Sequence, residues 1–280
     1  MSNRRRIELR GCTALVTGAS AGIGLHVARR LASAGANLVI AARHAENLET
    51  AAGLLRASGV KVLAVPTDVG RRDDLERLVD SAIGEFRTIE VLVNNAGIEA
   101  FCHYEDLPLG RIDETIRVNL TSALLLTRLV VPHMLSAGRG HVVNMSSTAG
   151  KHGPAFGALY GTTKAGLINF TQALRAEYRG HGVSASVICP GFTDDGGIYD
   201  RMKVHSGRRS PALLGSTTAD RVARAVVRAI EKDVPETIVN WTPLRPIMVL
   251  TQMFPSLGAT LARAASVRFL KRVADSHDVE

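Results

Sequence analysis

The sequence predicts an α/β protein in which a parallel sheet lies between two layers of helices, and three observations support this. Short apolar runs that contain β-branched residues alternate with longer amphipathic stretches, as in βαβ units. A glycine-rich turn separates the first apolar run from the first amphipathic stretch. Further glycines stand where several amphipathic stretches end. We therefore expect a Rossmann-like, doubly wound parallel sheet of about seven strands, in three layers, with a short helical C-terminal extension.

Seven short runs are expected to form the strands, because β-branched and apolar residues favour extended structure. In chain order they are Cys12–Thr17, Asn37–Ala41, Lys61–Val65, Val91–Asn94, His141–Met145, Val183–Ile188 and Thr237–Asn240.

Six longer stretches between these runs have the apolar spacing of helices that bury one face. They are Gly22–Ser33, Ala45–Ala57, Arg72–Glu85, Leu107–Ser136, Ala158–Arg179 and Ala219–Glu231. Glycines, which adopt positive φ at low cost, follow four of them, at Gly35, Gly59, Gly138, Gly140 and Gly182.

The chain reads as one domain, 1–280, made of a core, 8–240, and an extension, 241–280. Residues Pro190–Ser216 are rich in glycine and charge, which predicts a mobile loop or lid. From Trp241 onward, prolines interrupt apolar clusters that stand beside basic residues. We expect an appended pair of short helices there.

Composition limits the classes of function. Hydrophobic residues make up 46% of the chain, so it can bury a core. The net charge is +8, but the basic residues are dispersed and aromatic residues are only 4%, which disfavours nucleic-acid binding. A phosphorylated cofactor or an anionic membrane surface accounts for the charge better. Cys12, Cys102 and Cys189 lack metal-binding spacing, so no metal is expected, and reduced thiols without a secretory signal predict a cytoplasmic protein.

The glycine-rich turn runs from Thr17 to Gly24 and has the spacing G-x-x-x-G-x-G. Between a strand and a helix, such a turn lets a pyrophosphate approach the backbone at the helix N-terminus. A purely structural turn is the alternative reading. The residues expected to contact a dinucleotide here are Gly18, Ser20, Ala21, Gly22, Ile23 and Gly24.

The residues after the second strand bear on the choice of cofactor. A carboxylate at this place would bind the ribose 2′-hydroxyl and repel a 2′-phosphate, whereas an arginine does the opposite. The chain has Ala42 and Arg43 here, which favours NADP(H), with NAD(H) as the alternative. The alternative is that Arg43 only begins a surface helix and has no role in cofactor binding.

Tyr160 and Lys164 are four residues apart, so on a helix they share a face. A nearby ammonium lowers the pKa of a phenol and makes it a usable acid and base. Ordinary surface amphipathicity is the alternative. Ser147, at the end of a predicted strand, would stand at the edge of the sheet where ligands bind. Asn119, inside an apolar helical stretch, suggests a kink or a water relay.

Together these motifs resemble the short-chain dehydrogenase/reductase family over about residues 8–240. The resemblance implies that Asn119, Ser147, Tyr160 and Lys164 are catalytic, with Ser147 orienting the substrate oxygen and Tyr160 acting as acid and base. It implies that Lys164 binds the nicotinamide ribose and lowers the pKa of Tyr160, and that Asn119 holds a water. Further cofactor contacts are implied at Asp68, Val69, Asn94, Asn95, Ala96, Gly97, Tyr160, Lys164, Pro190, Gly191 and Thr193.

Two positions depart from the family's usual pattern. Ala21 stands where NADP-using members often have a basic residue, and Thr193 is not at the usual offset of the threonine near the cofactor carboxamide. The resemblance implies an NADP(H)-dependent oxidoreductase acting on an alcohol/carbonyl pair, as a homodimer or homotetramer. The apolar, basic tail suggests a lipophilic substrate or a peripheral membrane contact. A 3-oxoacyl thioester reductase and a non-catalytic NADP-binding or membrane-adaptor protein are the alternatives.

Overall fold

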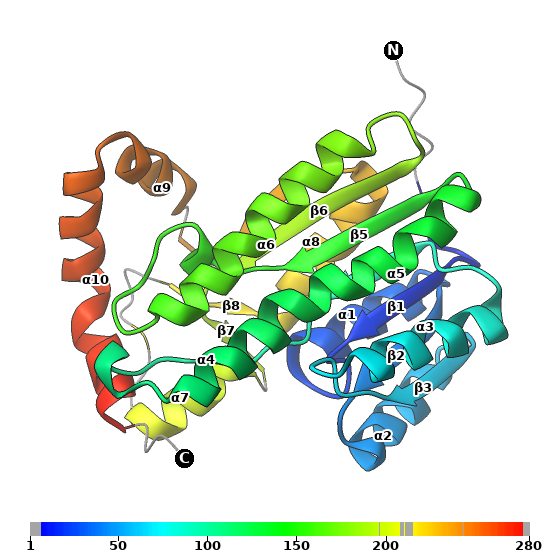
Figure 1. Cartoon of the computed structure of the whole chain (residues 1–280), viewed down its shortest axis with the longest axis horizontal. Helices are drawn as coiled ribbons and strands as arrows, with labels where there is room; N and C mark the ends of the chain where they lie inside the picture. Colours follow the sequence, from blue (N-terminus) through cyan, green and yellow to red (C-terminus); the bar gives the residue numbers. More distant parts are fainter. Residues whose placement is uncertain (1–6, 196, 208–209, 211–214, 243, 277–280) are drawn as a thin grey trace.

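The computed structural model describes residues 7–276 except 196, 208–209, 211–214 and 243. Within them, seven parallel strands form one sheet in the order β3-β2-β1-β4-β5-β6-β9 (Figure 1). Their bounds are β1 Thr13–Thr17, β2 Asn37–Ala42, β3 Val62–Pro66, β4 Val91–Asn94, β5 Gly140–Met145, β6 Val183–Pro190 and β9 Glu236–Val239. The order reverses between β1 and β4, which leaves a crevice beyond the carboxyl ends of these strands.

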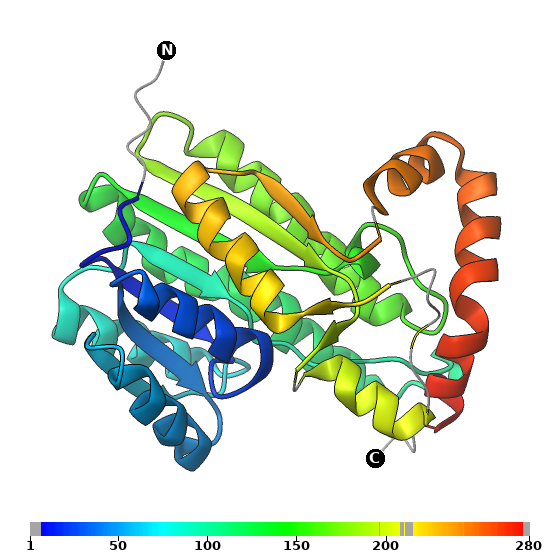
Figure 2. The ribbon, with the colours of Figure 1, turned by 180° about the vertical axis from the view of Figure 1, so that it is seen from behind.

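Helices cover both faces of the sheet, as the two ribbon views show (Figures 1 and 2). One face packs against α1 (Gly22–Ser33), α2 (Ala45–Arg56) and α8 (Ala219–Lys232). The other packs against α3 (Arg72–Phe86), α5 (Ser122–Ser136) and α6 (Ala158–Glu177). The fold class and the seven core strands expected from the sequence are confirmed, with bounds that differ by a few residues at most.

The helix expected at Leu107–Ser136 is interrupted. It consists of α4 (Leu109–Ile116), a π-helical turn at Arg117–Thr121, and α5. This turn contains Asn119, where the sequence suggested a kink or a water relay, and the interruption takes the form of a π-helical turn. Among the described residues, this stretch, Leu109–Ser136, is long and apolar enough to cross a membrane. Its side chains, such as Leu126 and Val130, are buried against the sheet, which is the arrangement of a core helix.

The segment Pro190–Ser216 is more regular than a mobile loop. Its described part contains β7 (Thr193–Asp194), which pairs with β8 (Thr217–Thr218), and α7 (Ile198–Ser206). The backbone N–H of Gly197 donates a 3.3 Å hydrogen bond to the Asp200 carboxylate at the start of α7. The prediction of an irregular loop was wrong for these residues, which form a strand and a helix although the sequence has little apolar periodicity. Closure of the segment as a lid stays a prediction.

The C-terminal extension forms α9 (Leu244–Met253) and α10 (Pro255–Ser276). Two helices were expected, but α10 has 22 residues and is not short. The ribbon views show both helices at one end of the molecule, with the C-terminal part of α10 beside α7 (Figures 1 and 2). Buried side chains of α10 (Phe269, Leu270 and Val273) form one apolar cluster with residues of α7. The sequence alone did not show that the extension packs against the core at this place.

Candidate active site

A cleft with a volume of about 960 Å³ runs along the carboxyl edge of the sheet. All the residues proposed as dinucleotide contacts line it, except Asn94, which is buried behind it. They are Gly18, Ser20, Ala21, Gly22, Ile23, Gly24, Arg43, Asp68, Val69, Asn95, Ala96, Gly97, Tyr160, Lys164, Pro190, Gly191 and Thr193. The structure thus gathers residues that lie as much as 175 positions apart, from Gly18 to Thr193, around one space. Their individual contacts with a cofactor stay predictions.

The glycine-rich turn closes tightly against the loop after β4. A Cβ atom on Gly24 would collide with the backbone oxygen of Gly18 and the side-chain nitrogen of Asn95. Asn95 holds the turn, since its Nδ2 donates to the backbone oxygen of Thr17 at 2.9 Å. Its own backbone N–H donates to the Thr17 hydroxyl at 3.0 Å. The first turn of α1 contains no acidic residue, so its backbone N–H groups offer an uncompensated positive end to a pyrophosphate.

The residues along the cleft fit a nicotinamide dinucleotide. Arg43 lies between the end of β2 and the start of α2, is exposed, and lines the cleft. Neither Ala42 nor His44 supplies a carboxylate that would repel a 2′-phosphate. At the far side of the sheet edge, Asp68 is fixed by its Oδ1, which accepts a 2.9 Å hydrogen bond from the backbone N–H of Gly70. A nucleotide can therefore lie across β1 and β4, from Asp68 and Arg43 to Tyr160.

Three proposed catalytic side chains converge at one end of this cleft. Tyr160 and Lys164 lie one turn apart on α6, both almost fully buried, and the Lys164 Nζ is 5.6 Å from the centroid of the Tyr160 ring. Ser147 follows β5, and its hydroxyl donates a 3.4 Å hydrogen bond to the backbone oxygen of Pro190. It lies near enough to Tyr160 to act on the pKa of the phenol. The Ser147 Oγ also accepts a 3.1 Å hydrogen bond from the backbone N–H of Ala149, which orients it. This arrangement can hold an oxygen atom of a substrate between two hydroxyl groups.

Asn119 lies behind the cleft rather than on its wall. Its Oδ1 accepts a 2.7 Å hydrogen bond from the backbone N–H of Ile98, and its Nδ2 donates to the Ile98 oxygen at 2.9 Å. The side chain therefore ties the π-helical turn to the loop after β4. Lys164 donates a 2.9 Å hydrogen bond to the backbone oxygen of Met145. The water expected at Asn119 stays a prediction.

The expected effect of Lys164 on the phenol is corrected by the structure. Burial raises the pKa of Tyr160 to about 12, and the nearby Ser147 hydroxyl only partly opposes this. Burial also lowers the pKa of Lys164 to about 8. The prediction of a lowered tyrosine pKa was wrong because it counted the positive charge and left out desolvation, which disfavours both charged forms. Tyr160 is accordingly a proton donor at neutral pH.

The part of the cleft beyond Tyr160 was not found in the sequence. Apolar and aromatic side chains from several segments line it: Phe101, Pro154, Phe192, Tyr199, Met202 and Leu270. The rings of Phe101 and Tyr160 lie 5.3 Å apart, and Phe192 contacts both Tyr199 and Phe269. We call this wall the apolar roof. The apolar cluster in the tail was the available signal, but nothing local indicated that it would fold back over the site.

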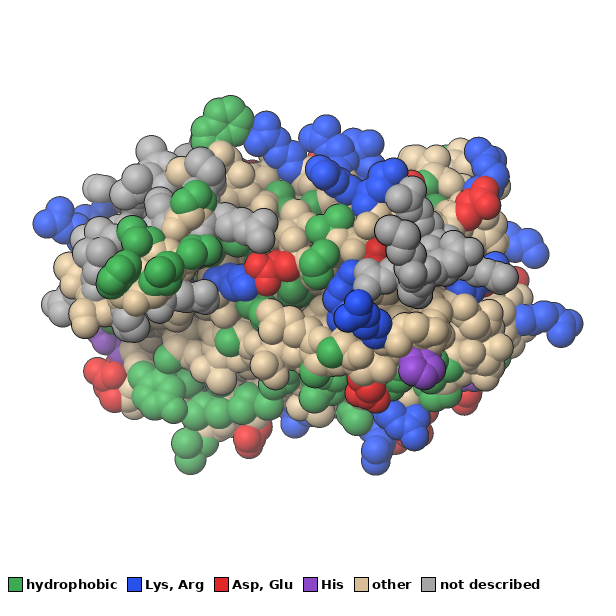
Figure 3. All heavy atoms as spheres, turned by 90° about the horizontal axis from the view of Figure 1, so that it is seen from above, with side chains coloured by type: hydrophobic (Ala, Val, Ile, Leu, Met, Phe, Trp, Pro, Cys, Tyr) green, Lys and Arg blue, Asp and Glu red, His purple; other side chains and the backbone are tan. Residues whose placement is uncertain are grey.

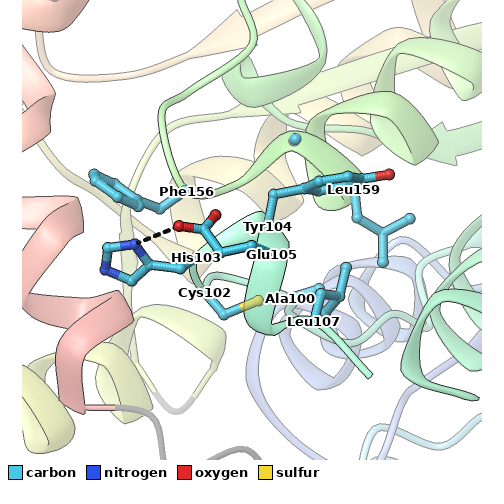
Figure 4. A pocket seen from close by; sticks show the side chains of 9 residues that line it. Ala100, Cys102, His103, Tyr104, Glu105, Leu107, Phe156 and Leu159 are labelled. Carbon is cyan, nitrogen blue, oxygen red and sulfur yellow. Dashed lines mark ion pairs between the residues drawn. The ribbon is translucent and has the colours of Figure 1, made fainter. Parts of the chain in front are cut away.

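The end of α10 is fixed beside the roof by His103. Its Nε2 lies 2.9 Å from an oxygen of Asp275, and its Nδ1 lies 3.8 Å from Glu105. Figure 4 shows His103 and Glu105 in a small neighbouring pocket of about 290 Å³, which is also lined by Phe156 and Cys102. The His103 and Phe156 rings meet edge to face. The contact between His103 and Asp275 connects α10 to the loop that follows β4.

The fold and the site define an oxidoreductase that uses a nicotinamide dinucleotide. The profile of the short chain dehydrogenase family matches residues 12–200. The chain belongs to this family of NAD(P)-dependent oxidoreductases. It is 41% identical over 250 residues to the ketoacyl reductase HetN of Nostoc sp., covering 89% of this chain and 85% of that protein. It is 36% identical to a D-beta-hydroxybutyrate dehydrogenase of Cupriavidus necator, covering 66% of this chain and 71% of that protein.

Solved structures show the same fold with both forms of the cofactor. A metagenomic short-chain oxidoreductase in complex with NADP superposes with a TM-score of 0.72 at 31% identity, covering 84% of this chain and 100% of that chain. An NAD+-bound xylitol dehydrogenase superposes with a TM-score of 0.78 at 25% identity, with the same coverage. The cofactor class is therefore NAD(P), and the choice between its two forms depends on this chain's own residues.

Proposed function

We propose that the protein is an NADP(H)-dependent oxidoreductase that interconverts a lipophilic alcohol and its carbonyl compound. The observation that supports this best is the convergence of Ser147, Tyr160 and Lys164 beneath the apolar roof. A non-catalytic NADP-binding protein would not require a proton donor at this place. Cofactor consumption with a panel of lipophilic ketones tests the proposal against a binding or adaptor role.

In the direction of reduction, Ser147 and Tyr160 hold the carbonyl oxygen between their hydroxyl groups. A nicotinamide dinucleotide held by the residues of the cleft would supply the hydride that reduces the carbonyl carbon. Tyr160 donates its proton to the oxygen, and its high pKa keeps that proton in place until negative charge develops. Lys164, held by Met145, places a positive charge beneath the tyrosine ring and offers hydrogen bonds to the ribose.

Arg43 provides a test of cofactor preference. The wild-type protein is expected to bind NADPH at least about tenfold more tightly than NADH, a difference of 1.4 kcal/mol. Arg43→Ala should remove most of this preference by weakening NADPH alone, because only NADPH has a 2′-phosphate for the guanidinium. Fluorescence titration with each nucleotide measures both dissociation constants. Arg72→Ala, on the exposed side of α3, is the control, and equal weakening of both nucleotides by Arg43→Ala would contradict the role.

Leu270 provides a test of the lipophilic substrate. It is buried in α10 and lines the cleft, so Leu270→Ala removes apolar contact from the roof. We expect kcat/KM for a medium-chain ketone to fall about tenfold, mainly through KM, since a few buried methylene contacts are worth 1–3 kcal/mol. The smallest ketones should lose less. Leu270→Met, which conserves volume, should keep near wild-type kinetics; a uniform loss with every ketone would argue against a substrate contact.

A 3-oxoacyl thioester reductase is the second candidate. The resemblance to a ketoacyl reductase over 89% of the chain favours it. Steady-state rates with an acetoacetyl thioester and with a simple ketone of equal length compare the two candidates directly. A strong preference for the thioester would replace the first proposal.

We also propose a cytoplasmic homodimer or homotetramer, in keeping with the family. Light scattering after size-exclusion chromatography measures the mass of the assembly.

A further inference from the structure

The outer side of α9 and the residues next to it expose large apolar side chains. Trp241, Val249, Leu250, Met253 and Phe254 are between 43% and 72% exposed. Single exposed apolar residues are ordinary on a soluble protein, but a contiguous group marks an interaction site. We call these five side chains the α9 face. Figure 3, which shows the molecule from above, has hydrophobic side chains at its left end, where α9 lies.

The α9 face adjoins the catalytic cleft. Met248 and Leu250 line the cleft, and Val249 between them is half exposed. One short helix therefore contributes both to the wall of the cleft and to the outer surface.

Basic residues predominate over acidic ones in the C-terminal extension and on the adjoining part of α8. Residues 241–276 contain five arginines and lysines and a single acidic residue, Asp275. The guanidinium of Arg221 lies 5.1 Å from the centroid of the Trp241 ring. Arg224 and Arg228 follow Arg221 at helical spacing on α8 and are exposed, with Asp220 pairing to Arg224. Figure 3 shows Lys and Arg side chains along the edge of the same view.

We infer that the α9 face docks onto the surface of an anionic lipid bilayer. Apolar side chains on a short surface helix enter the boundary between headgroups and acyl chains, and tryptophan favours that depth. Each nearby lysine or arginine adds about 1 kcal/mol of attraction to an anionic leaflet. A second copy of the chain is disfavoured as the occupant, because two cationic surfaces would repel each other. The inference goes beyond the proposed function. Only the idea that a substrate enters the cleft from the bilayer rests on the proposed function.

The test uses the full-length protein and vesicles of phosphatidylcholine with or without phosphatidylglycerol. The wild-type protein is expected to co-sediment with the anionic vesicles and to be released in large part by high salt, which screens the attraction. Met253→Glu with Phe254→Glu should lower the vesicle partition coefficient at least about tenfold, since both side chains lose apolar burial and gain negative charge. Leu54→Glu, at a residue of α2 that is 53% exposed, is the matched control and should bind like the wild type.

Three outcomes would overturn the inference. The first is that the folded wild-type protein fails to sediment with anionic vesicles. The second is that the Leu54 variant loses as much vesicle binding as the double variant. The third is that the double variant differs from the wild type in its mass in solution. The last result would assign the α9 face to contact between copies. Reduction of a small water-soluble ketone is measured in parallel, because neither Met253 nor Phe254 lines the cleft. Normal turnover without vesicle binding rejects the docking surface and leaves the proposed function intact.

Discussion

Replacing Tyr160 by phenylalanine is expected to lower kcat for carbonyl reduction by about 10²- to 10⁴-fold, the usual contribution of a general acid. The variant loses the phenolic hydroxyl and its proton. It keeps the aromatic ring, which packs against Phe101 with a centroid distance of 5.3 Å. The buried packing around α6 should therefore persist. Steady-state kinetics at saturating NADPH and substrate measure the loss.

The NADPH dissociation constant separates this effect from a damaged cofactor site. Tyr160→Phe should change it by less than about threefold, because the lost group acts mainly in the transition state. The melting temperature should stay close to that of the wild type. A variant that retains about a tenth or more of the wild-type kcat would show that another group supplies the proton.

The fold was predictable because its signals are local. Each core strand is a short run of apolar, β-branched residues, and the turn from Thr17 to Gly24 identifies the first βα unit. The observed bounds of helices differ from the expected ones where tertiary contacts determine where an element begins or ends. Asn119 is one example, because its two hydrogen bonds to Ile98 stabilise a π-helical turn that no helical periodicity shows.

The cofactor half of the site was predictable for the same reason, since its residues lie in short motifs at the ends of strands. The substrate half was not. Phe101, Met202 and Leu270 come from segments far apart in the sequence and meet only through packing of α7 and α10. The pKa of Tyr160 likewise depends on burial, which becomes known only when the neighbours are placed.

Lys164→Met is expected to lower kcat/KM by about 10²-fold or more while making the folded protein more stable at neutral pH. The loss of activity follows from removal of the charge beneath Tyr160 and of the hydrogen bonds offered to the ribose. Methionine fills a similar space without a charge that must be desolvated. The loss of the hydrogen bond to the Met145 oxygen opposes part of the gain. Kinetics and thermal unfolding of the same preparation measure both changes.

The pH dependence of this stability difference has a definite sign. Burial lowers the pKa of Lys164 from 10.5 to about 8, so between these values the unfolded chain binds a proton that the folded protein does not. The free energy of unfolding of the wild type therefore rises with pH across this range, by at most roughly 3 kcal/mol from this group. Below about pH 8 the folded protein contains the buried ammonium, and Lys164→Met has its largest advantage.

As the pH rises toward 10.5, the wild-type lysine becomes neutral in the folded protein and the advantage of the methionine variant should disappear. Denaturant unfolding of both proteins at pH 7 and near pH 10 measures the difference between them, in which ionisations shared by both proteins cancel. A variant that is less stable than the wild type by the same amount at both pH values would show that Lys164 is not a destabilising buried charge. The expected result, a less active but more stable variant at pH 7, means that the protein keeps an unfavourable ammonium for the chemistry at Tyr160.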